Sequence, residues 1–210
     1  MSSSIDRYEK NKELILRTLA ASMGERVRSD EPMKDHTSMK VGGPADIFAD
    51  TASADEISLA IRLARENGFP YYVMGNGSNI IVRDGGYRGL IIHLGSGYSS
   101  AEAREGDTVW AQCGASLGAV SRLACENSLA GMEFASGIPG SVGGAVAMNA
   151  GAYGGEMKDI ITYVKVLTPD GIETLDAAKL DCGHRPASCS GTDIRLWRLP
   201  SAFLRETRRR

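Results

Sequence analysis

Residues 135–156 read Ala-Ser-Gly-Ile-Pro-Gly-Ser-Val-Gly-Gly-Ala-Val-Ala-Met-Asn-Ala-Gly-Ala-Tyr-Gly-Gly-Glu, and we call them the long glycine segment. So little side-chain bulk lets a backbone approach a large, flat ligand closely. Flexible linkers are also rich in glycine, but their other residues are polar. Here Ile138, Val142, Val146 and Met148 are interspersed among the glycines. The segment is therefore predicted to be buried and to line a ligand-binding site.

The glycine excess of the whole chain is concentrated at this place. Glycine makes up 25 of 210 residues, and eight of them fall within residues 131–155. The total is about 12%, against a usual value of about 7%. The excess is local, which indicates a specialised backbone rather than a low-complexity chain.

A second group of glycines precedes it, in the stretch Met74-Gly-Asn-Gly-Ser-Asn-Ile80. We call residues 75–79 the short glycine loop. It lies between two apolar stretches, residues 71–74 and 80–82, which are predicted strands. Glycines there allow a positive φ and expose consecutive N–H groups, an arrangement that binds anions such as phosphate. An ordinary hairpin turn is the alternative, since the loop matches neither the P-loop nor the complete Rossmann pattern.

The remaining pattern predicts an α+β fold of two subdomains that meet near residue 97. Helices are expected over residues 5–23, 54–67 and 116–126, the second opened by a capping box of Ser53 and Glu56. Strands are expected over residues 47–49, 90–94 and 108–113, and a hairpin around Pro169-Asp-Gly171. Residues 31–44 are expected to be irregular.

Composition excludes several classes of function. The net charge of −2 gives no electrostatic reason to expect a nucleic acid or an anionic membrane as partner. No run reaches the roughly 18 apolar residues of a membrane span. The first residues lack the apolar core of a signal peptide, so a cytoplasmic protein is expected. The four cysteines have no metal-ligand spacing, so free thiols and no metal site are expected.

Three ordered motifs resemble one known family. They are Thr37-Ser-Met-Lys-Val-Gly-Gly-Pro-Ala-Asp46, Gly75-Asn-Gly-Ser-Asn79 and Gly137-Ile-Pro-Gly-Ser-Val-Gly-Gly-Ala145. Together they are similar to the UDP-N-acetylenolpyruvoylglucosamine reductases (UDP-N-acetylmuramate dehydrogenases) of bacterial peptidoglycan synthesis. The likeness runs from about residue 28 to residue 185.

The resemblance implies a fold and an activity. The fold is the FAD-binding fold of the vanillyl-alcohol-oxidase type, followed in the family by a third domain that covers the substrate. The implied organisation is an N-terminal helix (residues 1–30), two FAD-binding subdomains (residues 31–97 and 98–185) and a tail (residues 186–210). The implied reaction passes hydride from NADPH to FAD and then reduces a UDP-sugar enolpyruvyl ether. A monomer is expected.

The resemblance also assigns site residues. The short glycine loop would hold the FAD pyrophosphate, the long glycine segment would line the ribityl and isoalloxazine side, and residues 41–44 would close against the adenine half. The implied FAD-binding residues are Val41, Gly42, Gly43, Gly75, Asn76, Gly77, Ser78, Asn79, Gly137, Ile138, Pro139, Gly140, Ser141, Gly143, Gly144, Ala145, Asn149, Gly151 and Ala152. The two glycine-rich regions are expected to face one common cleft.

The catalytic residues are only partly matched. Arg185 occupies the place of the family arginine that stabilises developing enolate charge, and His184 stands where the family has tyrosine. A surface salt bridge is the alternative role of Arg185. The family's proton-donating serine and its carboxylate belong to the third domain, and neither motif occurs in this sequence. An inactive, flavin-binding remnant is therefore an alternative to the reductase, and another FAD enzyme of the same fold is a weaker one.

The last thirty residues differ from the rest in composition. Residues 181–210 hold seven arginines and three acidic residues, a balance of +4, whereas the first 180 residues carry −6. A shifted reading frame after Arg185 is one hypothesis, since another frame of suitable codons gives a continuation like the family's. A genuine basic tail is the alternative. On either hypothesis we expect this segment to be irregular rather than packed.

Overall fold

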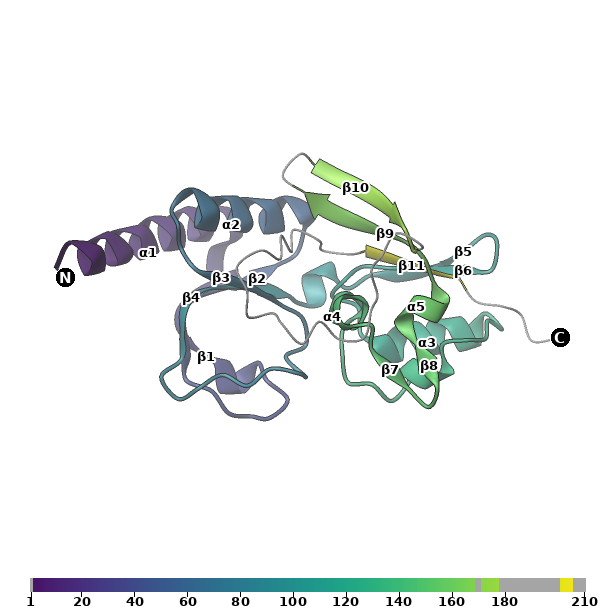
Figure 1. Cartoon of the computed structure of the whole chain (residues 1–210). Coiled ribbons are helices and arrows are strands. Elements are labelled where there is room, and N and C mark those ends of the chain that lie inside the picture. The colour runs from purple at the N-terminus through teal and green to yellow at the C-terminus, as the bar shows by residue number, and fades with distance from the viewer. Residues whose placement is uncertain (1, 169–170, 178–200, 206–210) are drawn as a thin grey trace. The chain divides into compact units, whose positions relative to one another are not determined.

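The computed structural model describes residues 2–168, 171–177 and 201–205, and it divides into two compact units (Figure 1). Unit 1 is Met1–Tyr98 and unit 2 is Ser99–Arg210. Both units mix helices with strands, as the sequence predicts. The division falls in the loop after the last strand of unit 1.

Unit 1 is built on a four-stranded sheet in the order β1-β2-β4-β3. The strands are β1 Val27–Pro32, β2 Pro44–Thr51, β3 Tyr71–Met74 and β4 Tyr87–Leu94. β1 is antiparallel to β2, whereas β4 is parallel to both β2 and β3. β2 is almost wholly buried along its length, as expected of a central strand covered on both faces.

Two long helices cover one face of this sheet (Figure 1). They are α1 Ser2–Met23 and α2 Ala54–Glu66, which contact each other and both contact β2. Ile15 and Leu19 of α1 and Ile57 and Ile61 of α2 are fully buried. Three 3₁₀ turns complete the unit, η1 Gly24–Arg26, η2 Met33–Asp35 and η3 Ser96–Tyr98.

The ends of α2 follow the sequence pattern. The hydroxyl of Ser53 accepts the N–H of Glu56 at 3.2 Å, which confirms the predicted N-cap. The predicted capping box is only half formed, because the carboxylate of Glu56 accepts the N–H of Ala52 instead of that of Ser53. At the other end Gly68 has φ +59°, and the N–H of Phe69 returns to the carbonyl of Ala64 at 2.7 Å. This Schellman geometry ends the helix where glycine and proline predict its end.

In unit 1 one predicted strand is absent, and one strand forms that was not predicted. Residues 80–82 form no strand; instead the neighbouring carbonyl of Arg83 accepts the N–H of Gly43 at 2.9 Å. Residues 27–32 form β1, which the sequence pattern did not indicate, because its burial alternates weakly and only Val27 is buried. Pairing with β2, rather than local preference, makes this segment a strand.

Unit 2 contains a five-stranded sheet in the order β10-β9-β11-β6-β5, with every pair antiparallel. The strands are β5 Ala101–Arg104, β6 Thr108–Ala111, β9 Ile161–Thr168, β10 Gly171–Asp176 and β11 Ser201–Arg205. β9 and β10 are the hairpin predicted around Pro169-Asp-Gly171. A short hairpin, β7 Gly151–Ala152 and β8 Gly155–Glu156, lies outside this sheet.

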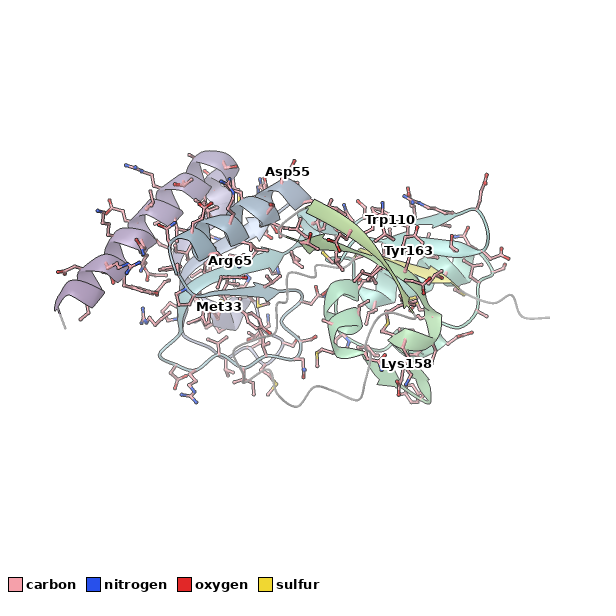
Figure 2. The ribbon with its side chains drawn as sticks, turned by 45° about the horizontal axis from the view of Figure 1, so that its top comes forward. Met33, Asp55, Arg65, Trp110, Lys158 and Tyr163 are labelled. Atoms are coloured by element: carbon pink, nitrogen blue, oxygen red, sulfur yellow. The ribbon has the colours of Figure 1, made fainter. Side chains whose placement is uncertain are left out.

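Helices cover one side of the sheet of unit 2 (Figure 1). They are α3 Leu117–Glu126, α4 Val142–Met148 and α5 Met157–Ile160, with the 3₁₀ turn η4 Glu133–Ala135. Val109, Val164 and Val166 of the sheet and Leu117 and Val120 of α3 are buried in one core. Trp110 on β6 and Tyr163 on β9 are only partly buried, and Figure 2 shows both on the sheet, away from Lys158 on α5.

The segment Ser201–Arg205 contradicts one expectation. It forms β11, which pairs with β6 on one side and β9 on the other. The prediction of an irregular tail is therefore wrong for these five residues. Residues 178–200 and 206–210 lie outside the described residues, and so does the point at which the frame shift was hypothesised. Among the described residues no helix is both long enough and apolar enough to cross a membrane.

Candidate functional site

The short glycine loop follows the last residue of β3. It thus lies at the carboxyl end of a parallel strand, the usual side for ligands in sheets of this kind. Among the described residues, no backbone hydrogen bond uses the N–H groups of Gly75, Asn76, Gly77 or Ser78. Amides without an acceptor within the described chain are available to an anion. The binding of a phosphate by this loop stays a prediction.

Gly77 fixes where this loop sits. Its φ is +62°, and a Cβ on it would stand 2.0 Å from the carbonyl oxygen of His36. In addition, the N–H of Ser38 donates to the carbonyl of Gly77 at 3.1 Å. No other residue fits here, so Gly77 is required by the packing of the loop on residues 36–38, whatever the loop binds.

Residues 41–43 are held just as tightly. The carbonyls of Gly42 and Gly43 accept the N–H groups of Lys34 and Met33, each at 3.2 Å. A Cβ on Gly43 would stand 1.9 Å from the carbonyl oxygen of Asp84. These two glycines therefore allow close packing between segments of unit 1 itself. Val41 beside them is 46% exposed and remains available to a ligand.

Exposed apolar side chains surround these segments. Met39, Val41 and Ile81 are 60%, 46% and 71% exposed. Residues 41–43 and 81–83 are neighbours, because a Cβ on Gly42 would stand 2.9 Å from Cβ of Val82. Unit 1 thus offers unpaired amides in its short glycine loop, and an apolar surface on the adjoining segments.

The long glycine segment in unit 2 contains a helix that the sequence did not indicate. α4 begins after Ser141, and its first N–H groups are bound by the residues after β6. Val142 donates to the carbonyl of Ala115 and Gly143 to that of Cys113, both at 2.8 Å. The carbonyl of Gly140 accepts the N–H of Leu117 at 2.9 Å. Residues 140–143 are therefore fixed against residues 113–117.

The glycines of this segment serve two purposes. A Cβ on Gly143 would stand 2.7 Å from Cβ of Cys113, and one on Gly151 would stand 2.7 Å from the carbonyl oxygen of Gly155. These two positions are filled by unit 2 itself. In contrast, a Cβ on Gly137 would meet nothing within 4 Å, and Gly144 has only the Ser141 hydroxyl at 3.4 Å. Gly137 and Gly144 are exposed, so they form the low-bulk surface that a flat ligand could approach.

Asn149 has a structural task as well as its expected role at the site. It ends α4 with φ +46°, and its amide nitrogen donates to Glu156 at 2.7 Å. Its amide oxygen accepts the N–H of Lys158 at 3.0 Å. These bonds hold the β7–β8 hairpin beside α4. Ala152 lies half-buried on that hairpin.

The tip of this hairpin is a residue that the sequence analysis did not single out. Tyr153 has φ +53° and its side chain is 98% exposed. Gly154 follows with φ +86°, so the pair forms a tight two-residue turn. In the sequence this turn is indicated only by the pattern Ala-Tyr-Gly-Gly, which is equally typical of an irregular loop.

Other predicted sites are placed as follows. Cys113 and Cys125 are free thiols, and burial raises the pKa of Cys113 to about 12. Within residues 2–168, 171–177 and 201–205, no three His, Cys, Asp or Glu side chains gather as a metal site would require. Arg185 and His184 lie outside the described residues, so their roles stay predictions. The short glycine loop lies in unit 1 and the long glycine segment in unit 2, and the common cleft likewise stays a prediction.

Comparison with known proteins defines the class. The chain belongs to the FAD binding domain family, which matches residues 45–176. The structure of an alkyldihydroxyacetonephosphate synthase shares the fold, with a TM-score of 0.65 at 17% identity over 93% of this chain and 40% of that one. The α+β fold of the vanillyl-alcohol-oxidase type is confirmed.

Closer relatives narrow the assignment within that class. A UDP-N-acetylenolpyruvoylglucosamine reductase of Geobacillus kaustophilus (strain HTA426) is 48% identical over 86% of this chain and 59% of its own length. A Clostridium botulinum (strain Hall) reductase is 51% identical over 74% of this chain and 51% of its own. The crystal structure of a UDP-N-acetylenolpyruvylglucosamine reductase from Thermus caldophilus has a TM-score of 0.68 at 30% identity, covering 87% of this chain and 62% of that one. The resemblance carried by the three motifs is confirmed, and the chain spans between about half and three fifths of the length of these relatives.

Proposed function

We propose that this chain binds FAD and takes part in the reduction of UDP-N-acetylenolpyruvoylglucosamine, with NADPH as the hydride donor. The observation that carries the proposal is the short glycine loop at the end of β3, in a chain of the FAD binding domain family. The named relatives supply the substrate class, a UDP-sugar used in peptidoglycan synthesis.

The residues of unit 1 fit the pyrophosphate of FAD. Amides of Gly75, Asn76, Gly77 and Ser78 have no acceptor in the described chain and supply donors for phosphate oxygens. No basic side chain is needed, because a rigid nest of N–H groups by itself favours negative charge. The apolar side chains of Met39, Val41 and Ile81 offer contact area for the adenine half.

The residues of unit 2 fit the flat end of the cofactor. Gly137 and Gly144 are exposed and have free space where a Cβ would stand. Ile138, Pro139, Gly140, Ser141 and Ala145 form the backbone around them. FAD would supply the redox chemistry, because no amino-acid side chain transfers a hydride. The protein's part is to bind the cofactor, orient it and exclude water from one side.

A spectroscopic and kinetic measurement on the purified 210-residue chain tests this proposal. We expect a bound flavin, seen by its visible absorbance, after FAD is added and the excess removed (about 1 FAD per chain). NADPH oxidation would then be followed with and without the enolpyruvyl substrate. No retained flavin contradicts the cofactor assignment. Flavin binding without substrate-dependent oxidation would favour the flavin-binding remnant.

A further inference from the structure

Two segments with candidate FAD-binding residues, the short glycine loop and residues 41–43, are both linked to the backbone at His36. This residue lies between η2 and the motif that begins at Thr37. Gly77 of the short glycine loop packs against the carbonyl oxygen of His36. The N–H of Ser38, two residues further on, donates to the carbonyl of Gly77. The position of the loop therefore depends on where the backbone of residues 36–38 lies.

The side chain of His36 is fixed on the sheet of unit 1. Its ring stacks on Phe48 of β2 with centroids 4.1 Å apart, and Phe48 is fully buried. Its Nε2 lies 2.7 Å from a carboxylate oxygen of Glu31 at the end of β1. Arg28 binds the same carboxylate at 2.7 Å. The imidazole is thus held both through its face and through its edge, and only 16% of it is exposed.

Thr37 connects His36 to residues 41–43 through hydrogen bonds. Its side chain is buried, with 2% exposure, and its hydroxyl donates to the carbonyl of Val41 at 2.9 Å. The N–H of Lys40 returns to the carbonyl of Thr37 at 3.1 Å, and Lys40 has φ +55°. Residues 37–41 form a closed turn, so any displacement at His36 also displaces Gly42 and Gly43.

We propose that His36 is a positioning residue that, clamped between Phe48 and Glu31, holds the short glycine loop and residues 41–43 in the geometry that binds the FAD pyrophosphate. This inference rests on the proposed function. His36 touches no ligand atom in this proposal; it acts through its own carbonyl and through Thr37. A loop that binds an anion through its N–H groups binds more tightly when these groups are already in place, because ordering a loose loop on binding costs affinity.

The chain contains a matched control, His93. Its ring also packs near Phe48, at 5.2 Å, and its Nδ1 lies 2.8 Å from a carboxylate oxygen of Asp50. Its side chain is 19% exposed, close to the value for His36. However, the backbone of His93 lies in β4, held by ladders to β2 and β3 on both sides. The His93 ring also lies 5.9 Å from the His36 ring, so this control removes a neighbour of the imidazole but leaves the backbone link from His36 to the loop in place. Loss of the His93 ring should therefore cost stability without moving the short glycine loop.

The experiment compares three variants of the whole chain: His36→Ala, His36→Phe and His93→Ala. FAD affinity is measured by quenching of flavin fluorescence. Stability is measured by urea unfolding of the FAD-free protein. We expect His36→Ala to raise the Kd for FAD about tenfold or more. His36→Phe keeps the stacked ring and should stay within about threefold of wild type. His93→Ala should lose similar stability yet stay within about twofold of the wild-type Kd.

Two results would overturn the role of His36: a wild-type Kd in His36→Ala, or an equal rise in Kd in His93→Ala. A wild-type chain that binds no FAD contradicts the proposed function instead. In that event hydrogen exchange of the Ser38 amide decides whether His36 positions the loop. Faster exchange in His36→Ala than in His93→Ala supports the positioning role, and equal exchange in the two variants contradicts it.

Discussion

Gly143 lies directly against Cys113: its N–H donates to the Cys113 carbonyl at 2.8 Å, and a Cβ on Gly143 would stand 2.7 Å from Cβ of Cys113. The contact joins the start of α4 to the residues after β6. It also shows that two adjacent glycines can have different reasons to be glycine. Gly143 is buried by the fold, whereas its neighbour Gly144 is exposed.

The first prediction compares these two glycines. Gly143→Ala should lower the free energy of unfolding by about 1–3 kcal/mol, because the added methyl overpacks a rigid contact. Gly144→Ala should leave it unchanged or raise it by up to about 1 kcal/mol, because alanine is the better helix former. Urea unfolding of the FAD-free chain measures both. Equal effects of the two variants would contradict the assignment of the Gly143 position to packing.

The second prediction concerns thiol reactivity. Burial raises the pKa of Cys113 to about 12, whereas Cys125 is exposed at the end of α3. Because the thiolate is the reactive form, iodoacetamide at pH 8 should alkylate Cys125 in the native chain and leave Cys113 unmodified. Peptide mass spectrometry before and after denaturation checks this. Rapid alkylation of native Cys113 would show that the contact with Gly143 opens readily.

The third prediction is a pH dependence of stability. Two hydrogen bonds from Arg26, at 2.5 and 2.7 Å, hold the pKa of Glu56 below its usual 4.5, and the N–H of Ala52 adds to this. A lowered pKa in the folded state means a contribution to stability that is present above the usual pKa. It is lost as the pH falls from about 4.5 through the lower, folded-state value.

Glu56→Gln should therefore destabilise the chain at pH 7 by roughly 0.5–1 kcal/mol, and the difference from wild type should shrink below about pH 4.5. Glu66→Gln on the same helix is the control, because its contact with Arg62 is exposed and 4.0 Å long. Urea unfolding at several pH values measures both variants. A pH-independent difference for Glu56→Gln would exclude the ion pair as its cause.

The fourth prediction concerns a buried hydroxyl. The side-chain oxygen of Thr162 on β9 is buried and has no hydrogen-bond partner among the residues that the structure describes. Replacing a buried polar atom that lacks a partner by a methyl removes a desolvation cost. Thr162→Val should therefore raise the free energy of unfolding by about 1 kcal/mol, with no loss of strand preference. A destabilised Thr162→Val variant would show that the hydroxyl is bonded in solution.

Features that depend on a few neighbouring residues were predictable from the sequence. Ser53 caps α2 and Gly68 ends it, since both act within one turn of the helix. The β9–β10 hairpin follows from a turn sequence between two apolar runs. The α+β class followed from the alternation of helix and strand patterns, and the FAD-binding fold followed from the family resemblance carried by three motifs.

The sequence could not separate glycines that bind from glycines that pack. Gly77 is fixed by the carbonyl of His36, 41 positions earlier, and Gly143 by Cys113, 30 positions earlier. The same limit explains why the sequence did not predict α4 and β1. α4 forms in a stretch of poor helix formers because Ala115 and Cys113 accept its first N–H groups, and β1 forms because β2 offers it a ladder. Local preference is a few tenths of a kcal/mol for each residue, so contacts between distant segments outweigh it wherever the fold brings them together.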